Sequence, residues 1–252
     1  MMRVLITSGG TKVPIDTVRD ITNMSRGTFG SKIATQFLKA KQSVLFFHAK
    51  GSRTPFKYEI DFTNSKGVTY NYWGTPRLVD AEKQAVFCRK HRDQYSEVVF
   101  RNYDDYAENL WKLIGSYKPD ILILAAAVSD YTVVNTVDGK IRSAENLTIN
   151  LKPCEKLISR VKESFPDVFL VGFKLLVKSK REDLENAIKQ SLESNHCDLV
   201  VGNDLADIKS SDHTLLIGKK DCSGIEYYKS DTHDPDYLAQ KLTDIILQQV
   251  KK

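Results

Sequence analysis

Residues 4–30 read VLITSGGTKVPIDTVRDITNMSRGTFG, and this stretch decides how the chain begins to fold. Its apolar start predicts a buried strand, which breaks at Gly9 and Gly10. After a polar loop, Gly27 and Gly30 open a segment with the pattern of a helix. Glycines after a first strand let the backbone approach an anion, and a helix N-terminus offers it free N–H groups. The stretch therefore predicts a phosphate or nucleotide site.

The spacing of these glycines differs from two familiar nucleotide-binding motifs. A dinucleotide fold carries G-x-G-x-x-G directly between strand and helix, whereas here a long polar loop separates Gly10 from Gly27. The chain also has no G-x-x-x-x-G-K-[ST] sequence. From these residues alone, a nucleotide site and a glycine-rich surface loop both remain open.

Short apolar runs alternate with longer amphipathic stretches along the rest of the chain. The predicted strands cover 3–7, 43–49, 120–126, 168–173 and 198–202, followed by an antiparallel pair at 213–218 and 224–229. The predicted helices cover 29–41, 103–117, 153–165, 180–194 and 234–249. The first five strands are nearly continuous apolar runs, as expected where helices cover both faces of a sheet. We therefore predict one α/β domain over residues 1–252, with a doubly wound, mainly parallel, Rossmann-like sheet and an antiparallel C-terminal hairpin.

Two segments interrupt this alternation. Residues 66–101 predict an insertion with a helix near 76–93, which is either a packing arm or a dimerisation element or lid. Residues 131–152 carry Asp138-Gly139 between β-branched runs, which favours a hairpin. Ligands of a parallel α/β sheet bind beyond the carboxyl ends of its strands. The residues that fall at or just beyond predicted strand ends are Gly9, Ala127, Asp130, Phe173 and Asn203.

The composition excludes several classes of protein. The values of 41% hydrophobic and 27% charged residues are those of a globular protein. The longest apolar run, 121–128, is too short to cross a membrane, and residues 1–10 do not resemble a signal peptide. The net charge of +5 is spread along the chain, which argues against nucleic-acid binding. The four cysteines and five histidines show no metal-ligand spacing, so we expect a reduced, cytoplasmic protein without a zinc site.

Several segments, in order, resemble phosphopantothenoylcysteine synthetase. They are SGGTKVPID at 8–16, VRDITNMSRG at 18–27, AAAVSDY at 125–131, GKIRS at 139–143, LKPCEKLI at 151–158, VGFKL at 171–175 and VVGNDLAD at 200–207. The resemblance is to the monofunctional form, without the flavin-dependent decarboxylase half. It implies a homodimeric ligase of coenzyme A biosynthesis that binds small molecules. Such an enzyme joins 4′-phosphopantothenate to L-cysteine through an acyl nucleotidylate, with a nucleoside triphosphate and Mg²⁺.

The resemblance also implies which residues form the site. Asn23 and Lys140 would be catalytic, the first donating to the acyl oxygen and the second offsetting charge on the triphosphate. The nucleotide would contact Gly9, Ser25, Gly27, Gly30, Phe173, Lys174 and Asn203. Phosphopantothenate would contact Asn23, Ala126, Ala127 and Asp130, while Arg19 reaches the substrate phosphate in the partner's site. Lys140 would lie on a flap that is mobile without ligand, with Arg142 as the alternative residue.

Other interpretations remain open. Without the resemblance, Phe173 would be a core aromatic residue, and Asp130 and Asn203 would be turn residues at strand ends. A nicotinamide-dependent reductase would use a Y-x-x-x-K pair, for which Tyr237 and Lys241 are the match. A non-catalytic nucleotide-binding module is the third possibility. The family divides between CTP and ATP users, and we expect CTP, with ATP as the alternative.

Overall fold

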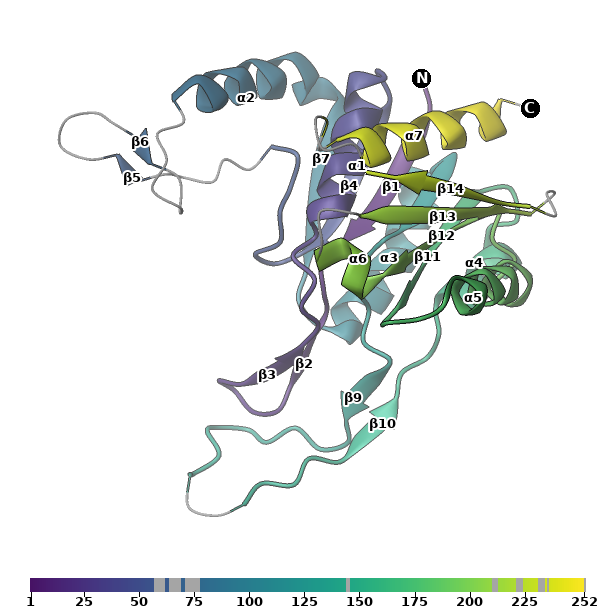
Figure 1. The fold of residues 1–252 in the computed structure, drawn as a ribbon. Coiled ribbons are helices and arrows are strands. Elements are labelled where there is room, and N and C mark those ends of the chain that lie inside the picture. The colour runs from purple at the N-terminus through teal and green to yellow at the C-terminus, as the bar shows by residue number, and fades with distance from the viewer. Residues whose placement is uncertain are drawn as a thin grey trace.

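The computed structural model describes residues 1–56, 62–63, 69–70, 78–143, 146–209, 213–220, 224–230, 234 and 236–251, with the backbone alone at 62–63, 69–70, 78–84 and 209. An eight-stranded sheet forms its centre (Figure 1). The strands of this sheet are β1 (Arg3–Ser8), β4 (Ser43–Ala49), β7 (Tyr95–Phe100), β8 (Ile121–Leu124), β11 (Phe169–Leu176), β12 (Leu199–Asp204), β13 (Thr214–Lys219) and β14 (Ile225–Lys229). The helices are α1 (Thr28–Lys39), α2 (Leu78–His91), α3 (Tyr103–Tyr117), α4 (Ile158–Ser164), α5 (Arg181–Ser194), α6 (Leu205–Lys209) and α7 (Tyr237–Val250), with a 3₁₀ turn, η1 (Arg92–Gln94), after α2.

The strand order is β14-β13-β12-β11-β8-β1-β4-β7. From β12 to β7 every neighbouring pair is parallel, whereas β13 and β14 are antiparallel. Numbered along the chain, the parallel strands follow the order 3-2-1-4-5-6, which is that of the Rossmann fold. The order reverses between β1 and β8, and ligands of such sheets bind at that point. The predicted parallel sheet with a C-terminal antiparallel hairpin is therefore confirmed.

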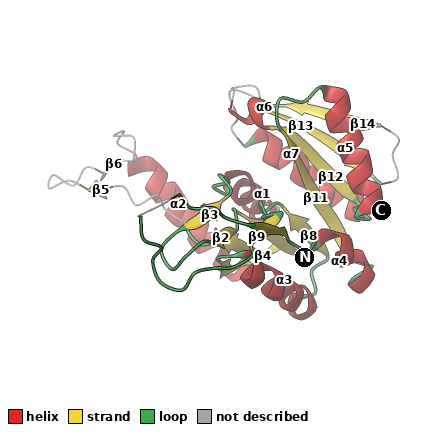
Figure 2. Ribbon diagram, turned by 90° about the horizontal axis from the view of Figure 1, so that it is seen from below, coloured by secondary structure: helices red, strands yellow, loops and turns green. Residues whose placement is uncertain are grey.

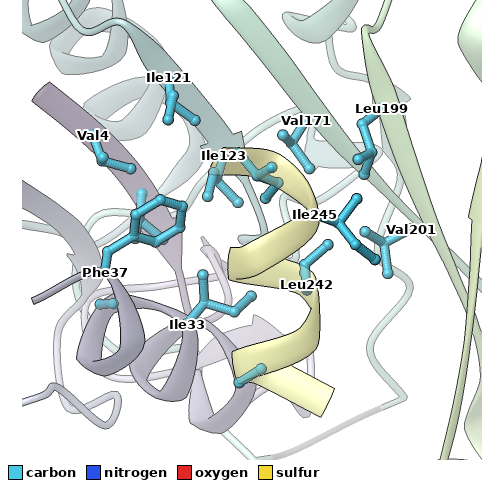
Figure 3. Close-up of a cluster of buried hydrophobic side chains, with 14 of the residues drawn as sticks. Val4, Ile33, Phe37, Ile121, Ile123, Val171, Leu199, Val201, Leu242 and Ile245 are labelled. Atoms are coloured by element: carbon cyan, nitrogen blue, oxygen red, sulfur yellow. The ribbon is translucent and has the colours of Figure 1, made fainter. Parts of the chain in front are cut away.

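Helices cover both faces of the sheet, which explains why its strands are apolar almost throughout. On one face, Val4 and Ile123 pack against Phe37 of α1 and Leu242 of α7 (Figure 3). On the other face, alternate strand residues such as Leu5 pack against α3, α4 and α5. Figure 2 shows the two helical layers on opposite sides of the strands. Because successive side chains of a strand point to opposite faces, each strand contributes to both cores.

Two short antiparallel arms project from the carboxyl edge of the sheet (Figure 1). One pairs β2 (Lys12–Pro14) with β3 (Asp20–Thr22), and the other pairs β9 (Tyr131–Val133) with β10 (Leu151–Pro153). A further pair, β5 (Phe62–Thr63) and β6 (Thr69–Tyr70), precedes α2. Among the described residues, no helix is long and apolar enough to cross a membrane.

The structure corrects several predicted boundaries. Residues 95–100, assigned to an insertion, form the edge strand β7, which the alternating sequence YSEVVF did not reveal because one face of it is exposed. The helix predicted at 76–93 is α2, while residues 66–68 and 71–77 of the same segment lie outside the described residues.

Two more differences lie nearer the site. The predicted hairpin at 131–152 does pair its ends, but Asp138-Gly139 lies within the long loop 134–150 and is not a two-residue turn. The helix predicted at 153–165 begins only at Ile158, because Pro153 belongs to β10. Strands β11 and β12 also extend past their predicted ends, so Phe173 and Asn203 lie inside strands.

Candidate active site

The loops that follow β1 and β8 are hydrogen-bonded to each other beside the point where the strand order reverses. The Ala127 amide donates to the Gly9 carbonyl at 2.7 Å, and the Thr11 amide donates to the Ala127 carbonyl at 3.2 Å. The Ala126 amide donates to the buried Thr7 hydroxyl at 3.2 Å. These bonds fix the two loops as one surface, and Gly9, Ala126 and Ala127, all predicted to bind ligand, lie together on it.

The predicted glycines bring the start of α1 unusually close to β1. Gly27 is the N-cap residue of α1 with φ +71°, and its carbonyl accepts a hydrogen bond from the Ser8 hydroxyl at 3.1 Å. A Cβ atom on Gly30 would lie 2.4 Å from Ser8 Oγ, and one on Gly9, where φ is +84°, would lie 2.7 Å from Ala49 Cβ. Only glycine fits these contacts, which place the N-terminus of α1, where backbone N–H groups lack partners within the helix, beside Ser8 and Gly9 at the end of β1.

The loop between β3 and α1 places the two remaining polar candidates near the glycines. The Asn23 Nδ2 group donates to the Ala127 carbonyl at 2.8 Å. The Ser25 hydroxyl accepts a hydrogen bond from the Gly27 amide at 3.4 Å and is exposed. Asn23 is exposed as well, so its amide lies on the surface shared by the loops after β1 and β8.

Phe173 and Asn203 join an aromatic cluster that the sequence did not reveal. Phe29 of α1 meets the Phe173 ring edge-on at 6.2 Å and the His213 ring edge-on at 5.6 Å. Burial and the charge of Lys32 lower the pKa of His213, so its ring is neutral near pH 7. Its Nε2 atom then accepts a hydrogen bond from Asn203 Nδ2 at 3.0 Å. Phe29 and His213 carry no spacing signal, because only the tertiary fold brings the first turn of α1 beside Phe173 of β11 and the residue that precedes β13.

Lys174 does not join this cluster. It neighbours Phe173 on β11, so its side chain points to the other face of the sheet. Its partner in the register is Gly202, whose Cβ would meet Ile188 and Leu184 of α5. Lys174 therefore lies on the α5 side of the sheet, away from the cluster of Phe173 and Asn203.

A buried carboxylate, that of Asp16, joins the segments that carry Arg19 and Lys140. It accepts hydrogen bonds from the amides of Val18 and Arg19, each at 2.8 Å, and from the Ile141 amide at 3.1 Å. The Arg19 guanidinium pairs with Asp16 at 3.1 Å and donates to the Ile141 carbonyl at 3.2 Å. Burial alone would raise the pKa of Asp16, but these backbone bonds and the Arg19 charge hold it below its usual value.

These contacts of Asp16 and Arg19 with Ile141, which we call the clasp, determine where the predicted flap lies. Thr17 and Gly139 exchange two hydrogen bonds, from the Thr17 amide to the Gly139 carbonyl at 3.3 Å and from the Gly139 amide to the Thr17 hydroxyl at 2.9 Å. Lys140 and Arg142 are exposed at the outer side of the clasp. Contacts within a single chain thus hold the segments of Arg19 and Lys140 next to each other.

Two adjoining cavities open beside the loop after β8. The first, of about 250 Å³, is lined by Tyr106, Leu124, Ala126, Val128, Ser129, Asp130, Cys154, Glu155, Lys156, Leu157, Ile158 and Phe173. The second, of about 300 Å³, lies between the arms and the start of α3 and shares Cys154 and Glu155 with the first. The first cavity therefore joins Asp130 and Ala126 to the start of α4, where the sequence had predicted no site residue.

Two negative findings limit the chemistry. In the described part of the chain, no group of three or more His, Cys, Asp or Glu side chains could hold a metal ion. Tyr237 and Lys241, the possible reductase pair, lie on α7, where the Lys241 ammonium stacks over the Tyr228 ring of the edge strand β14 at 5.2 Å. Lys241 therefore lies beside the edge strand β14 and not beside the loops that follow β1 and β8.

Comparison with known proteins shows the family of the chain. The family described as "DNA/pantothenate metabolism flavoprotein C-terminal domain" matches residues 1–65 and 94–250. The chain is 31% identical to the Homo sapiens phosphopantothenate–cysteine ligase over 88% of this chain and 81% of that protein. It is also 31% identical to the Thermococcus kodakarensis coenzyme A biosynthesis bifunctional protein CoaBC over 87% of this chain and 45% of that protein. The chain thus spans about half the length of some relatives that it matches.

A solved structure shares the fold. A Cab2 mutant in complex with phosphopantothenate-cysteine superposes with a TM-score of 0.80 and is 27% identical, covering 99% of this chain and 86% of that one. The similarity therefore extends over nearly the whole chain.

Proposed function

The chain belongs to the phosphopantothenate–cysteine ligase family, and we propose that it condenses 4′-phosphopantothenate with L-cysteine through an acyl nucleotidylate. The observation that carries this proposal is the position of Asn23. Its Nδ2 group is held against the Ala127 carbonyl, between the glycines at the start of α1 and the cavity at Asp130. A phosphate bound at the glycines and an acyl group bound at the cavity would meet at this amide.

The roles of the residues follow from that placement. The α1 N-terminus, with Gly27 and Gly30, supplies N–H donors for phosphate oxygens. Asn23 donates to the acyl oxygen, where negative charge develops when the amine attacks the acyl carbon. When the amine of cysteine attacks, the C–N bond forms and the bond from the acyl carbon to the phosphate oxygen breaks. The electron pair leaves with the nucleoside monophosphate, and the nitrogen loses its proton to solvent.

Shielding from water is the other task of the site, since a mixed anhydride hydrolyses readily. The first cavity has an apolar wall of Leu124, Val128, Leu157 and Ile158 next to Ala126. The Cys154 thiol also lines it, and burial, together with the charges of Asp104 and Asp130, raises its pKa. The thiol therefore stays protonated near pH 7 and does not compete with the amine for the acyl carbon.

The nucleotide and metal are part of the same proposal. We expect the base to lie against Phe173 and Asn203, and we expect CTP, with ATP as the alternative. Mg²⁺ would arrive bound to the triphosphate, as it usually does in sites that offer few protein ligands. The ion would supply charge neutralisation on the phosphates.

We also propose that the enzyme is a homodimer formed through the two arms. Large apolar side chains are exposed on and beside both arms, and such side chains are common at protein–protein interfaces when they gather on one surface. They include Val18 (62% exposed), Met24 (82%), Tyr131 (54%) and Leu147 (51%). Burying them against a second copy would bring Arg19 of one chain toward the site of the other. Sedimentation should give a dimer, and Val18→Asp combined with Met24→Asp should give monomers.

Pyrophosphate release tests the function. Wild-type protein with Mg²⁺, phosphopantothenate and CTP or ATP should release pyrophosphate, and adding cysteine should then yield phosphopantothenoylcysteine and the nucleoside monophosphate. Nucleotide binding without pyrophosphate release, under conditions in which the human enzyme turns over, would instead favour a non-catalytic nucleotide-binding module.

A further inference from the structure

The start of α4 lies opposite the loop after β8 and is fixed to it. The Cys154 amide donates to the Asp130 carbonyl at 2.8 Å, and the Tyr103 hydroxyl donates to the Glu155 carbonyl at 2.7 Å. The Ser159 hydroxyl caps the turn by donating to the Lys156 carbonyl at 2.7 Å. Residues 154–156 therefore form a fixed wall of the first cavity, opposite Ala126 and Asp130, and not a loose linker.

The charges on this wall are unequal. Glu155 pairs with Arg160 at 2.5 Å, so its carboxylate is already neutralised. Lys156 forms no ion pair within the described part of the chain, and it is the only basic side chain among those that line the cavity. On the opposite wall, the negative charge of Asp130 acts on Cys154. The cavity lining thus combines the ammonium of Lys156, the carboxylate of Asp130 and the apolar side chains of Leu157 and Ile158.

That arrangement matches a small zwitterion with an apolar side chain. A free amino acid carries a carboxylate and an ammonium group on neighbouring atoms. We propose that the part of this cavity beside residues 154–158 is the amino-acid subsite, next to the acyl group, in which Lys156 binds the α-carboxylate of cysteine and the amino group faces Ala126 and Asp130. The CH₂SH group would lie against Leu157 and Ile158. The proposal rests on the ligase function and adds the residue that recognises the second substrate.

The carboxylate contact can be tested by removing either partner. Cysteamine is cysteine without its carboxylate, so it keeps the amine and thiol but has nothing for Lys156 to bind. Wild-type enzyme should use cysteine with a kcat/KM roughly ten- to hundredfold above that for cysteamine, the range expected for a charge-assisted contact. Lys156→Gln should lower kcat/KM for cysteine by this factor, leave that for cysteamine within about twofold, and Lys156→Arg should restore the preference.

Two controls separate this proposal from its premise. The pyrophosphate burst measured before any amine is added reports the first step alone, and Lys156→Gln should leave it unchanged. Lys152→Gln removes a nearby exposed lysine of β10 and should not change the ratio of the two amines. If Lys156→Gln slows both amines equally or neither, or if Lys152 sets the ratio, the subsite is wrong. If the wild type gives no burst with any nucleotide, the ligase function itself fails.

Discussion

Replacing Gly30 by alanine should destabilise the protein although the residue lies in a helix. The new Cβ would lie 2.4 Å from Ser8 Oγ and 2.8 Å from Ser8 Cβ, and Ser8 is fully buried at the end of β1. Neither side can move freely, because the Ser8 hydroxyl is bonded to the Gly27 carbonyl. Overpacking of this kind costs about 1–3 kcal/mol, while alanine in a helix returns about 0.5–1 kcal/mol. We expect the free energy of unfolding to fall by about 1 kcal/mol, the difference between the midpoints of these two ranges.

Urea denaturation followed by circular dichroism measures this change, and Gly115→Ala is the matched control. Gly115 also lies in a helix, but its Cβ would have nothing within 4 Å. That variant should be more stable than wild type by about 0.5–1 kcal/mol. In a Ser8→Gly background, Gly30→Ala should lose most of its cost because the clashing atoms are gone. The reasoning would be refuted if Gly30→Ala lowered the free energy of unfolding equally in the wild-type and Ser8→Gly backgrounds, or if Gly30→Ala and Gly115→Ala changed it in the same direction.

Four further outcomes concern the site. Asn23→Asp should lower kcat by roughly 10²–10³ with the fold intact, because a carboxylate cannot donate to the acyl oxygen; turnover within twofold of wild type would remove it from the mechanism. Mixed dimers of Arg19→Ala and Asn23→Asp subunits should regain one active site in two, and heterodimers without activity would show that Arg19 does not act in trans. Lys140→Ala should slow pyrophosphate release more than it weakens nucleotide binding. In the wild type, hydrogen exchange at residues 131–152 should fall when nucleotide, phosphopantothenate and Mg²⁺ are added. Unchanged exchange together with normal turnover of Lys140→Ala would leave the segment without a catalytic role. The folded state lowers the pKa of Asp16, so the ionised carboxylate stabilises the protein above its unfolded pKa of about 3.9, and this stabilisation is lost as pH falls through the lower folded value. Asp16→Asn should therefore be less stable than wild type at pH 7 and should lose less stability on acidification. Parallel profiles of stability against pH for the two proteins would contradict this.

Much of the architecture could be predicted because it depends on local patterns. Strands buried on both faces must be apolar throughout, and helices between them must be amphipathic, so β1, β4, β8, β11 and β12 and the helices α1, α3 and α5 were predicted close to their observed positions. The edge strand β7 was not predicted because polar residues on its exposed face interrupt the apolar run that marks the other strands. The helix α4 was predicted too long because strand pairing between Pro153 and Tyr131 is not a local property.

The sequence by itself determined the parallel sheet, the glycines at the start of α1, and the order of the segments that carry the family resemblance. Those features depend on residues close together in the chain, whose periodicity and spacing can be read directly. Only the tertiary structure decided that Asp16 joins the Arg19 and Lys140 segments, that His213 binds Asn203, and that α5 covers the face of the sheet on which Lys174 lies. It also decided that Lys156 lines a cavity with Asp130. Such contacts join residues far apart in sequence, and they exist only once the strands have set the register and the face of every side chain.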